Sequence, residues 1–372
     1  MIERTLSQVV IPKIGRGKAI IIVGPRQVGK TTFIANQLAG TNYQFFDGDD
    51  PTVRSLLDTP NTEQLRTLIG KANVVFIDEA QRISGIGLTL KIITDQFKHV
   101  QLWISGSSSF TLFNELSEPL TGRKWEYEMF PISWEEYQDH VGYLKAEQQL
   151  ENRLIYGMYP DIINHPGEER ELLQNLVNSY LYRDVLAYAE IRKPEVLEKL
   201  VQALALQIGS EVNYNELSQV VGVDRTTIQR YVDILEKGYV IFRLRSYSRN
   251  VRNEIKKSRK IYFYDNGIRN MIIGNLDALN LRPDVGGLWE NFLVSERMKQ
   301  NKYKLTLAKP YFWRTAQQQE VDYVEDIGQK LYGYEFKWRG TKAKLPKTFI
   351  EQYDAEGMTI SRDNFRDFVL LK

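Results

Sequence analysis

A glycine-rich loop between an apolar strand and a helix constrains this chain more than any other feature. The loop, Gly24-Pro25-Arg26-Gln27-Val28-Gly29-Lys30-Thr31, follows the apolar run Ala19–Val23 and precedes a helix-like segment that begins at Thr32. It fits the pattern G-x-x-x-x-G-K-[ST], in which the glycines let the backbone approach phosphate oxygens and a helix N-terminus faces their charge. We therefore expect Gly24 to Thr32 to bind ATP, with Lys30 reaching the β- and γ-phosphates and the Thr31 hydroxyl ligating Mg²⁺.

A second apolar strand ends in two carboxylates. Val74–Ile77 has four apolar residues and is followed directly by Asp78 and Glu79. In this arrangement we expect Asp78 to hold the Mg²⁺ shell and Glu79 to orient and polarise the attacking water. The acid pair favours hydrolysis of ATP over simple nucleotide binding.

Two further positions are candidates for contact with the γ-phosphate. The apolar strand Leu102–Ile104 ends in Ser105-Gly106-Ser107, and we prefer Ser107, although a serine-rich turn explains the pattern equally well. Arg123 follows Thr121-Gly122 and is expected to sense the γ-phosphate or to reach a neighbouring subunit as a finger. The second role of Arg123 requires a homo-oligomer.

Length and composition limit the remaining possibilities. At 372 residues the chain is too long for one core, so we expect two or three domains. The absence of cysteine excludes disulfides, cysteine nucleophiles and zinc ribbons. The start of the chain lacks the apolar stretch of a signal peptide, and its apolar runs are strand-sized, so we expect a cytoplasmic protein that does not enter a membrane. A net charge of +2 means that any surface for nucleic acid must be a local patch.

A different pattern begins near Glu195. An apolar helical stripe is followed by two short helices, which Asn213 and Asp224 are placed to cap. Two strands, Tyr239–Leu244 and Lys260–Tyr264, come next. This order of helices and strands is typical of a winged helix.

The second of these helices and the segment after it are strongly basic. Opposite its apolar positions the helix exposes a polar set of four residues, Arg225, Thr226, Gln229 and Arg230. Between Arg225 and Lys260 there are eleven basic residues against three acids: Arg225, Arg230, Lys237, Arg243, Arg245, Arg249, Arg252, Lys256, Lys257, Arg259 and Lys260 against Asp233, Glu236 and Glu254. Such an excess is expected for contact with a nucleic-acid backbone, so we predict DNA binding by the four helix residues with Lys256 and Lys257. The alternative is a winged helix that contacts protein or acts as a lid.

The last part of the chain carries a short pattern typical of nucleases. Asp322 is followed by Glu335 and Lys337, which share one face if they lie on a strand. Asp322 and Glu335 would bind Mg²⁺, Lys337 would position or activate a water, and Glu290 would add an acid from a helix. The pattern is short, and a sheet with charged edges explains it as well. We expect the tail of the chain, Asn364–Leu371, to add a last strand.

The chain as a whole resembles the bacterial and archaeal AAA-like ATPases that carry a C-terminal domain of unknown function. The motifs that carry the resemblance run through most of the chain: Gly24–Thr31, Phe76-Ile77-Asp78-Glu79-Ala80-Gln81, Ser105-Gly106-Ser107, Leu120-Thr121-Gly122-Arg123, Tyr159-Pro160, Tyr182-Arg183-Asp184, Asp265-Asn266-Gly267, Trp289-Glu290-Asn291, Trp313-Arg314 and Glu320-Val321-Asp322. The resemblance implies a P-loop core with an additional strand and a catalytic glutamate, then a winged helix, then a restriction-endonuclease-like domain.

Together these features predict an α/β protein with four parts. We expect an AAA-like P-loop domain over residues 1–135, a helical region over 136–192, a winged helix over 193–264 and a nuclease-like domain over 265–372. The first functional hypothesis is a Mg²⁺-dependent ATPase that acts on DNA, with metal-dependent cleavage in the last domain. The alternative is an ATP-switched signalling or scaffold protein that binds a protein partner and cleaves nothing.

Overall fold

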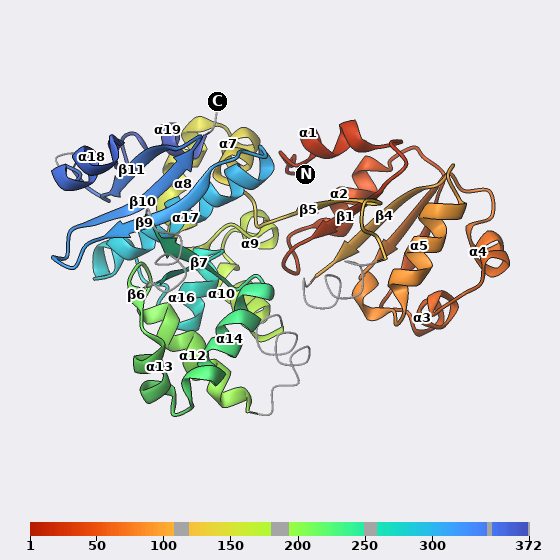
Figure 1. Cartoon of the computed structure of the whole chain (residues 1–372), viewed down its shortest axis with the longest axis horizontal. Helices are drawn as coiled ribbons and strands as arrows, with labels where there is room; N and C mark the ends of the chain where they lie inside the picture. Colours follow the sequence, from red (N-terminus) through yellow and green to blue (C-terminus); the bar gives the residue numbers. More distant parts are fainter. Residues whose placement is uncertain (108–118, 180–192, 249–258, 341–343, 371–372) are drawn as a thin grey trace. The chain divides into compact units, whose positions relative to one another are not determined.

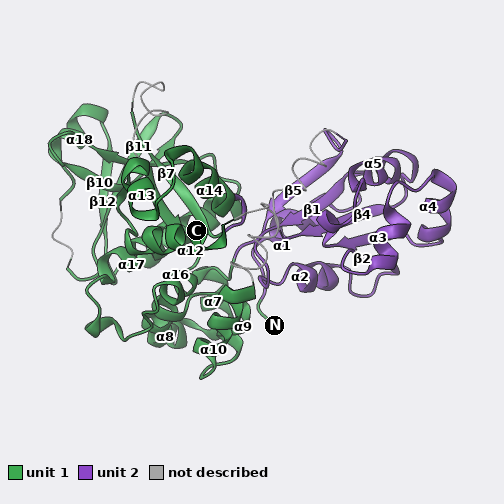
Figure 2. Cartoon of the chain, turned by 90° about the horizontal axis from the view of Figure 1, so that it is seen from below, with its two compact units in different colours: residues 1–2, 131–236, 240–372 green, residues 3–130, 237–239 purple. Residues whose placement is uncertain are grey.

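The computed structural model describes residues 1–107, 119–179, 193–248, 259–340 and 344–370, in two compact units (Figure 2). One unit contains residues 3–130 with 237–239, and we call it the loop unit because it carries the glycine-rich loop. The other contains residues 1–2, 131–236 and 240–372, and we call it the C-terminal unit. Each unit is described by itself.

The loop unit is built on a parallel sheet that, within the described residues, has five strands in the order β2-β3-β4-β1-β5. The strands are β1 (Ala19–Val23), β2 (Tyr43–Asp47), β3 (Val74–Asp78), β4 (Gln101–Gly106) and β5 (Lys124–Glu128). The helices between and before them are α1 (Ser7–Val10), η1 (Ile11–Lys13), α2 (Lys30–Gln37), α3 (Pro51–Leu57), α4 (Thr62–Ile69), η2 (Ala80–Arg82) and α5 (Ile86–Gln96) (Figure 1).

The burial of the central strands explains why this sheet is parallel. All five residues of β1 are buried, as are the last four of β3 and the last five of β4. Strands that are apolar throughout are covered on both faces, which is what crossover helices between parallel strands provide. The predicted alternation of strands and helices is therefore confirmed. Because the strands are parallel, the loop after β1 and the residues after β3 and β4 lie at the same edge of the sheet.

The C-terminal unit contains a mixed sheet with seven strands among the described residues, in the order β12-β11-β10-β9-β7-β8-β6. The strands are β6 (Glu211–Val212), β7 (Ile241–Ser246), β8 (Arg259–Phe263), β9 (Lys309–Arg314), β10 (Glu320–Ile327), β11 (Lys330–Phe336) and β12 (Glu356–Ile360). β7 pairs with β8 antiparallel and with β9 parallel, so one sheet joins strands from both sides of residue 265.

Helices from the whole length of this unit accompany the sheet. They are α7 (Trp134–Val141), α8 (Tyr143–Tyr156), α9 (Pro160–Asn164), α10 (Glu169–Leu176), α12 (Pro194–Leu206), α13 (Tyr214–Val221), α14 (Arg225–Lys237), α16 (Asn266–Ile272), η4 (Leu279–Leu281), α17 (Val285–Tyr303), α18 (Lys347–Tyr353) and α19 (Phe365–Val369). The order α12, β6, α13, α14, β7, β8 includes the helices and strands that the sequence predicts. Asn213 and Asp224 accept backbone N–H groups at the starts of α13 and α14.

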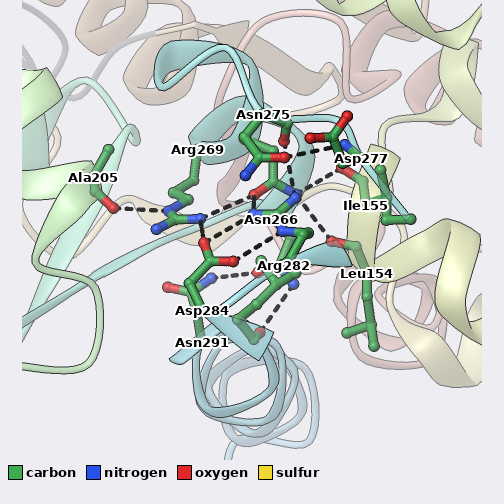
Figure 3. Close-up of polar contacts among 12 residues, drawn as sticks. Leu154, Ile155, Ala205, Asn266, Arg269, Asn275, Asp277, Arg282, Asp284 and Asn291 are labelled. Atoms are coloured by element: carbon green, nitrogen blue, oxygen red, sulfur yellow. Dashed lines mark hydrogen bonds and ion pairs between the residues drawn. The ribbon is translucent and has the colours of Figure 1, made fainter. Parts of the chain in front are cut away.

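A buried polar network ties these elements together (Figure 3). Arg269 of α16 donates to the Ala205 carbonyl at 2.8 Å and pairs with Asp284. The Asn270 amide donates to the Leu154 and Ile155 carbonyls at 3.2 and 2.8 Å. These bonds connect α8, α12, α16 and the start of α17 inside one unit, where each lost partner leaves a buried polar group unsatisfied.

One prediction for the end of the chain is wrong. The sequence of Asn364–Leu371 suggests a last strand, but Phe365–Val369 forms the helix α19. Phe365, Phe368 and Val369 are buried, and Phe368 packs edge-on against Tyr323 and Phe336. The last strand of the sheet is instead β12, whose residues 356–358 are exposed and carry no clear apolar pattern.

Candidate functional site

The glycine-rich loop lies at the carboxyl end of β1 and continues into α2. Gly24 has a φ of +151°, and a Cβ at this position would lie 2.0 Å from the Met129 carbonyl oxygen. Gly29 has a φ of +91° and precedes the first residue of α2. Both positions therefore require glycine, and the loop presents backbone N–H groups at the start of a helix, an arrangement suited to phosphate.

Lys30 is folded back onto this loop. Its ammonium donates to the Gly24 carbonyl at 2.9 Å and to the Pro25 carbonyl at 2.8 Å, and the side chain is buried. Burial lowers the pKa of Lys30 to about 8, although the nearby carboxylates of Glu79 and Asp78 act in the opposite direction. A phosphate group would supply the negative charge that these neutral carbonyls lack.

Asp78 at the end of β3 is surrounded by hydroxyl groups. The Thr31 hydroxyl donates to Asp78 Oδ2 at 2.7 Å, and the Ser105 hydroxyl from the end of β4 donates to Oδ1. The structure thus brings together Thr31 and Asp78, two of the residues predicted to bind Mg²⁺. Their oxygen atoms are the ligands that Mg²⁺ prefers, so the residues present fit this ion.

Glu79 lies beside Asp78 and is held by two side chains. The Ser107 hydroxyl donates to Glu79 Oε2 at 2.9 Å, and the Gln81 amide donates to the same oxygen. The Gln81 amide nitrogen also lies 3.0 Å from the Ser107 hydroxyl, which closes a triangle. Glu79 has a left-handed backbone, with φ 45° and ψ 41°, which is uncommon outside glycine and turns its side chain out of the strand direction.

No role is assigned from the sequence to two residues that contact this site, Arg4 and Gln81. Arg4 is buried and donates to the Val28 carbonyl of the loop at 2.9 Å and to the Phe130 carbonyl at 2.5 Å. No local sequence pattern around Arg4 predicts these hydrogen bonds. Gln81 lies in the run Asp-Glu-Ala-Gln, so the sequence does offer a signal for it, since an amide two residues after a catalytic acid can reach back to it.

Arg123 does not lie near the loop of its own chain. Its carbonyl accepts the Ala19 amide, which places it at the amino end of β5, whereas the loop follows the carboxyl end of β1. The length of the strand, about 16 Å at 3.3 Å per residue, separates these two edges. The Arg123 guanidinium pairs with Asp95 at 2.7 Å. The structure therefore gives no support to sensing of the γ-phosphate within the same chain.

In the C-terminal unit, α14 presents the predicted polar face. Arg225, Thr226, Gln229 and Arg230 are all exposed, while Ile228 and Val232 are buried on the other side. Lys256 and Lys257 lie outside the described residues. Not all of the basic residues counted from the sequence are available to a partner: Arg243 pairs with Asp233 at 2.7 Å and with Glu236, and Lys260 is buried.

Two acids of the predicted nuclease pattern, Glu290 and Asp322, lie near Lys260. The register that pairs Tyr323 with Tyr334 places Asp322 on β10 opposite Glu335 on β11. Burial, the nearby Glu290 and Glu335 raise the pKa of Asp322 to about 7, while Lys260 opposes this shift. Even so, no group of three or more His, Cys, Asp or Glu side chains is placed to hold a metal ion in the part of the chain that the structure describes.

Comparison with protein-family models divides the chain into three parts. Residues 16–138 match a family described as "AAA domain". Residues 147–279 match a domain of unknown function (DUF8612), and residues 285–367 match another (DUF4143). The first match contains the loop, Asp78 and Glu79, and it supports a P-loop ATPase domain that binds and hydrolyses ATP.

The chain is also similar to curated proteins without a described activity and to one solved ATPase structure. An uncharacterized protein of Mycobacterium tuberculosis is 29% identical over 334 residues, which cover 88% of this chain and 71% of that protein. An uncharacterized protein of Haemophilus influenzae is 24% identical over 276 residues, 70% of this chain and 68% of its own. The structure of a Walker-type ATPase of Pyrococcus abyssi covers 73% of this chain and 96% of that one, with a TM-score of 0.51 and 14% identity, a likeness of fold.

None of the described helices combines the length and the apolar character that crossing a bilayer requires.

Proposed function

We propose that this protein is a Mg²⁺-dependent ATPase in which Glu79 prepares the attacking water. The observation that carries the proposal is the convergence of three strand ends: the loop after β1, Asp78 and Glu79 after β3, and Ser105 and Ser107 after β4. Lys30 would leave the Gly24 and Pro25 carbonyls and bind the phosphates. Apart from this movement of Lys30, the side chains of Thr31, Asp78, Glu79, Ser105 and Ser107 already lie together, so the proposed site would need little further reorganisation.

Thr31 and Asp78 are the residues that would hold Mg²⁺ in this proposal. When bound, the ion neutralises charge on the phosphate oxygens. Glu79 accepts a proton from water, and the Ser107 hydroxyl and Gln81 amide fix its carboxylate in one orientation. The Ser107 hydroxyl would also contact the γ-phosphate.

The test is a comparison of nucleotide binding with hydrolysis in Glu79→Gln. The variant keeps the size of the side chain and loses the base, so we expect it to retain bound ATP while single-turnover hydrolysis falls about 100-fold or more. Filter binding of radiolabelled ATP and thin-layer separation of ADP measure the two quantities. Hydrolysis within a few-fold of wild type would remove Glu79 from this role.

The C-terminal unit is proposed to bind DNA through the exposed face of α14. The order of elements from α12 to β8 is that of a winged helix, and Arg225, Thr226, Gln229 and Arg230 would contact the duplex, with Lys256 and Lys257 in support. We also propose domain boundaries at residues 135, 192 and 264 and a cytoplasmic location. A homo-oligomer, in which Arg123 reaches the nucleotide of a neighbouring subunit, is a further part of the proposal.

A protein partner in place of DNA is the second candidate. It is favoured by the internal pairing of Arg243 with Asp233 and Glu236 and by the burial of Lys260, which reduce the basic excess at the surface. In that case ATP would switch the affinity of the C-terminal unit for another protein. Metal-dependent cleavage is not part of either proposal, because the buried Lys260 ammonium already pairs with two acids at that place, Glu290 and Glu320.

A further inference from the structure

An ammonium group lies among the acids of the C-terminal unit. Lys260 of β8 contacts Glu290 of α17 at 2.9 Å and Glu320 of β10 at 2.5 Å, and its side chain is only 2% exposed. The negative charge of Asp322, also on β10, raises the pKa of Lys260 as well. A buried charge is tolerated only when it is paired, and here one lysine faces acids from two other elements.

One oxygen atom of Glu290 accepts two hydrogen bonds. This atom, Oε1, accepts from the Lys260 ammonium at 2.9 Å and from the Tyr262 hydroxyl at 2.6 Å. The other, Oε2, faces Gly209, where an added Cβ would lie 3.1 Å away. Lys260 and Tyr262 are two residues apart on β8 and reach Glu290 together, so the strand supplies both donors from one face.

The other two acids of the predicted nuclease pattern, Asp322 and Glu335, also accept hydrogen bonds. The Phe336 amide donates to Asp322 Oδ2 at 2.8 Å, and the Lys337 ammonium donates to Glu335 Oε1 at 2.7 Å. Mg²⁺ requires a nearly octahedral set of oxygen ligands at about 2.1 Å. The buried Lys260 ammonium pairs with Glu290 and Glu320 and lies close enough to Asp322 to act on its charge, so a divalent ion among these acids would meet a fixed positive charge. The residues present therefore do not fit a divalent ion.

We propose that Lys260 is the resident cation of this cluster and takes the place of the divalent ion that metal-dependent nucleases use. The C-terminal unit then binds its partner without cutting it. The same contact serves a structural purpose, because it joins β8 to β10 and α17 across the sheet.

The first test uses the wild-type cluster and Mn²⁺, which reports binding through loss of the free-ion signal in electron paramagnetic resonance. All proteins carry Asp78→Asn and are free of nucleotide, so the site in the loop unit does not contribute. We expect Mn²⁺ to remain free at millimolar concentration. Binding of one Mn²⁺ per chain that disappears on adding Asp322→Asn would overturn the proposal.

The second test removes the resident cation. Lys260→Met leaves Glu290, Glu320 and Asp322 without their ammonium, so we expect Mn²⁺ affinity to rise at least about tenfold and Mn²⁺ to raise the melting temperature of this variant. The matched control is Lys309→Met, an exposed lysine of the same sheet, which should behave like wild type. A folded Lys260→Met protein, judged by circular dichroism, that binds Mn²⁺ no better than wild type would contradict the proposal. If the variant does not fold, the wild-type arm decides alone.

Discussion

At the scale of single residues, the hydrogen bonds that hold the Glu79 carboxylate are the most informative feature of the ATPase site. Its carboxylate is held by Ser107 from one strand end and by Gln81 from the turn that follows β3. A general base works only when its geometry relative to the water is right, so a residue that fixes the base affects the rate without touching the nucleotide. Gln81 is therefore assigned as a positioning residue.

Gln81→Ala should lower kcat about tenfold, which corresponds to about 1.4 kcal/mol of activation free energy, and change the KM for ATP less than about threefold. The reason is that the variant frees the Glu79 carboxylate but leaves the loop intact. Steady-state kinetics at saturating and limiting ATP separate the two parameters. Gln96→Ala, at the exposed end of α5, is the control. A Gln81→Ala protein with a raised KM and normal kcat would show that Gln81 acts on binding instead.

The lowered pKa of Lys30 predicts how nucleotide affinity depends on pH. An amine with a pKa of about 8 is charged below that pH and becomes neutral above it, so the attraction for phosphate is present at low pH and lost as the pH rises. We expect the Kd for ATP to be nearly constant below about pH 7 and to rise towards about tenfold per unit above about pH 8. Calorimetric titration measures it. The control is Lys30→Arg, whose guanidinium stays charged, so its affinity should not follow this pH dependence.

An affinity that stays constant in wild type from about pH 7 to about pH 9 would mean that Lys30 keeps its proton in the empty loop. The hydrogen bonds from Lys30 to the Gly24 and Pro25 carbonyls would then stabilise the charged amine more than burial destabilises it.

At the scale of elements, α14 is the surface on which the DNA proposal depends. Arg225 and Arg230 are exposed on one face of this helix, whereas Arg243 and Lys260 are paired within the unit. Only exposed charges release counterions from DNA on binding, so the first pair should contribute to the salt dependence and the second should not.

Replacing Arg225 and Arg230 together by alanine should weaken DNA binding and reduce the slope of log Kobs against log[salt] by about 2, because each phosphate contact contributes about 0.9. Fluorescence anisotropy with a labelled duplex at several salt concentrations measures the slope. Lys145→Ala with Arg170→Ala removes two exposed charges from α8 and α10 of the same unit and should leave the slope unchanged. Equal slopes in both double variants would favour the protein-partner alternative.

The elements also show what the sequence can predict. The strand β1 and the glycines at positions 24 and 29 follow from local rules, because a buried parallel strand is apolar throughout and the loop needs glycine. The helix α19 was misassigned because its buried residues, Phe365, Phe368 and Val369, are too few to show a helical period. The acids that pair with Lys260 lie on β10 and α17, far from it in the sequence. Counting charges within the segment 225–260 therefore cannot show that this lysine is paired and buried.

At the scale of the whole molecule, the loop unit and the C-terminal unit differ in how far their chemistry is understood. The loop unit has an AAA domain match, and Lys30, Thr31, Asp78 and Glu79 lie close together in it. The C-terminal unit matches two domains of unknown function and is held together by a sheet that runs across residue 265 and by the buried network of α16. The central claim about the molecule is therefore ATP hydrolysis at the glycine-rich loop.

The measurement that tests this claim most directly is steady-state ATP hydrolysis by the full chain with Mg²⁺, with Lys30→Ala as the blank and with duplex or single-stranded DNA present or absent. We predict Mg²⁺-dependent turnover in wild type and none above background in Lys30→Ala. Stimulation by DNA would connect the two units, and turnover that is indifferent to DNA would move the search to protein partners. Turnover of Lys30→Ala at the wild-type rate would contradict the assignment of the site itself.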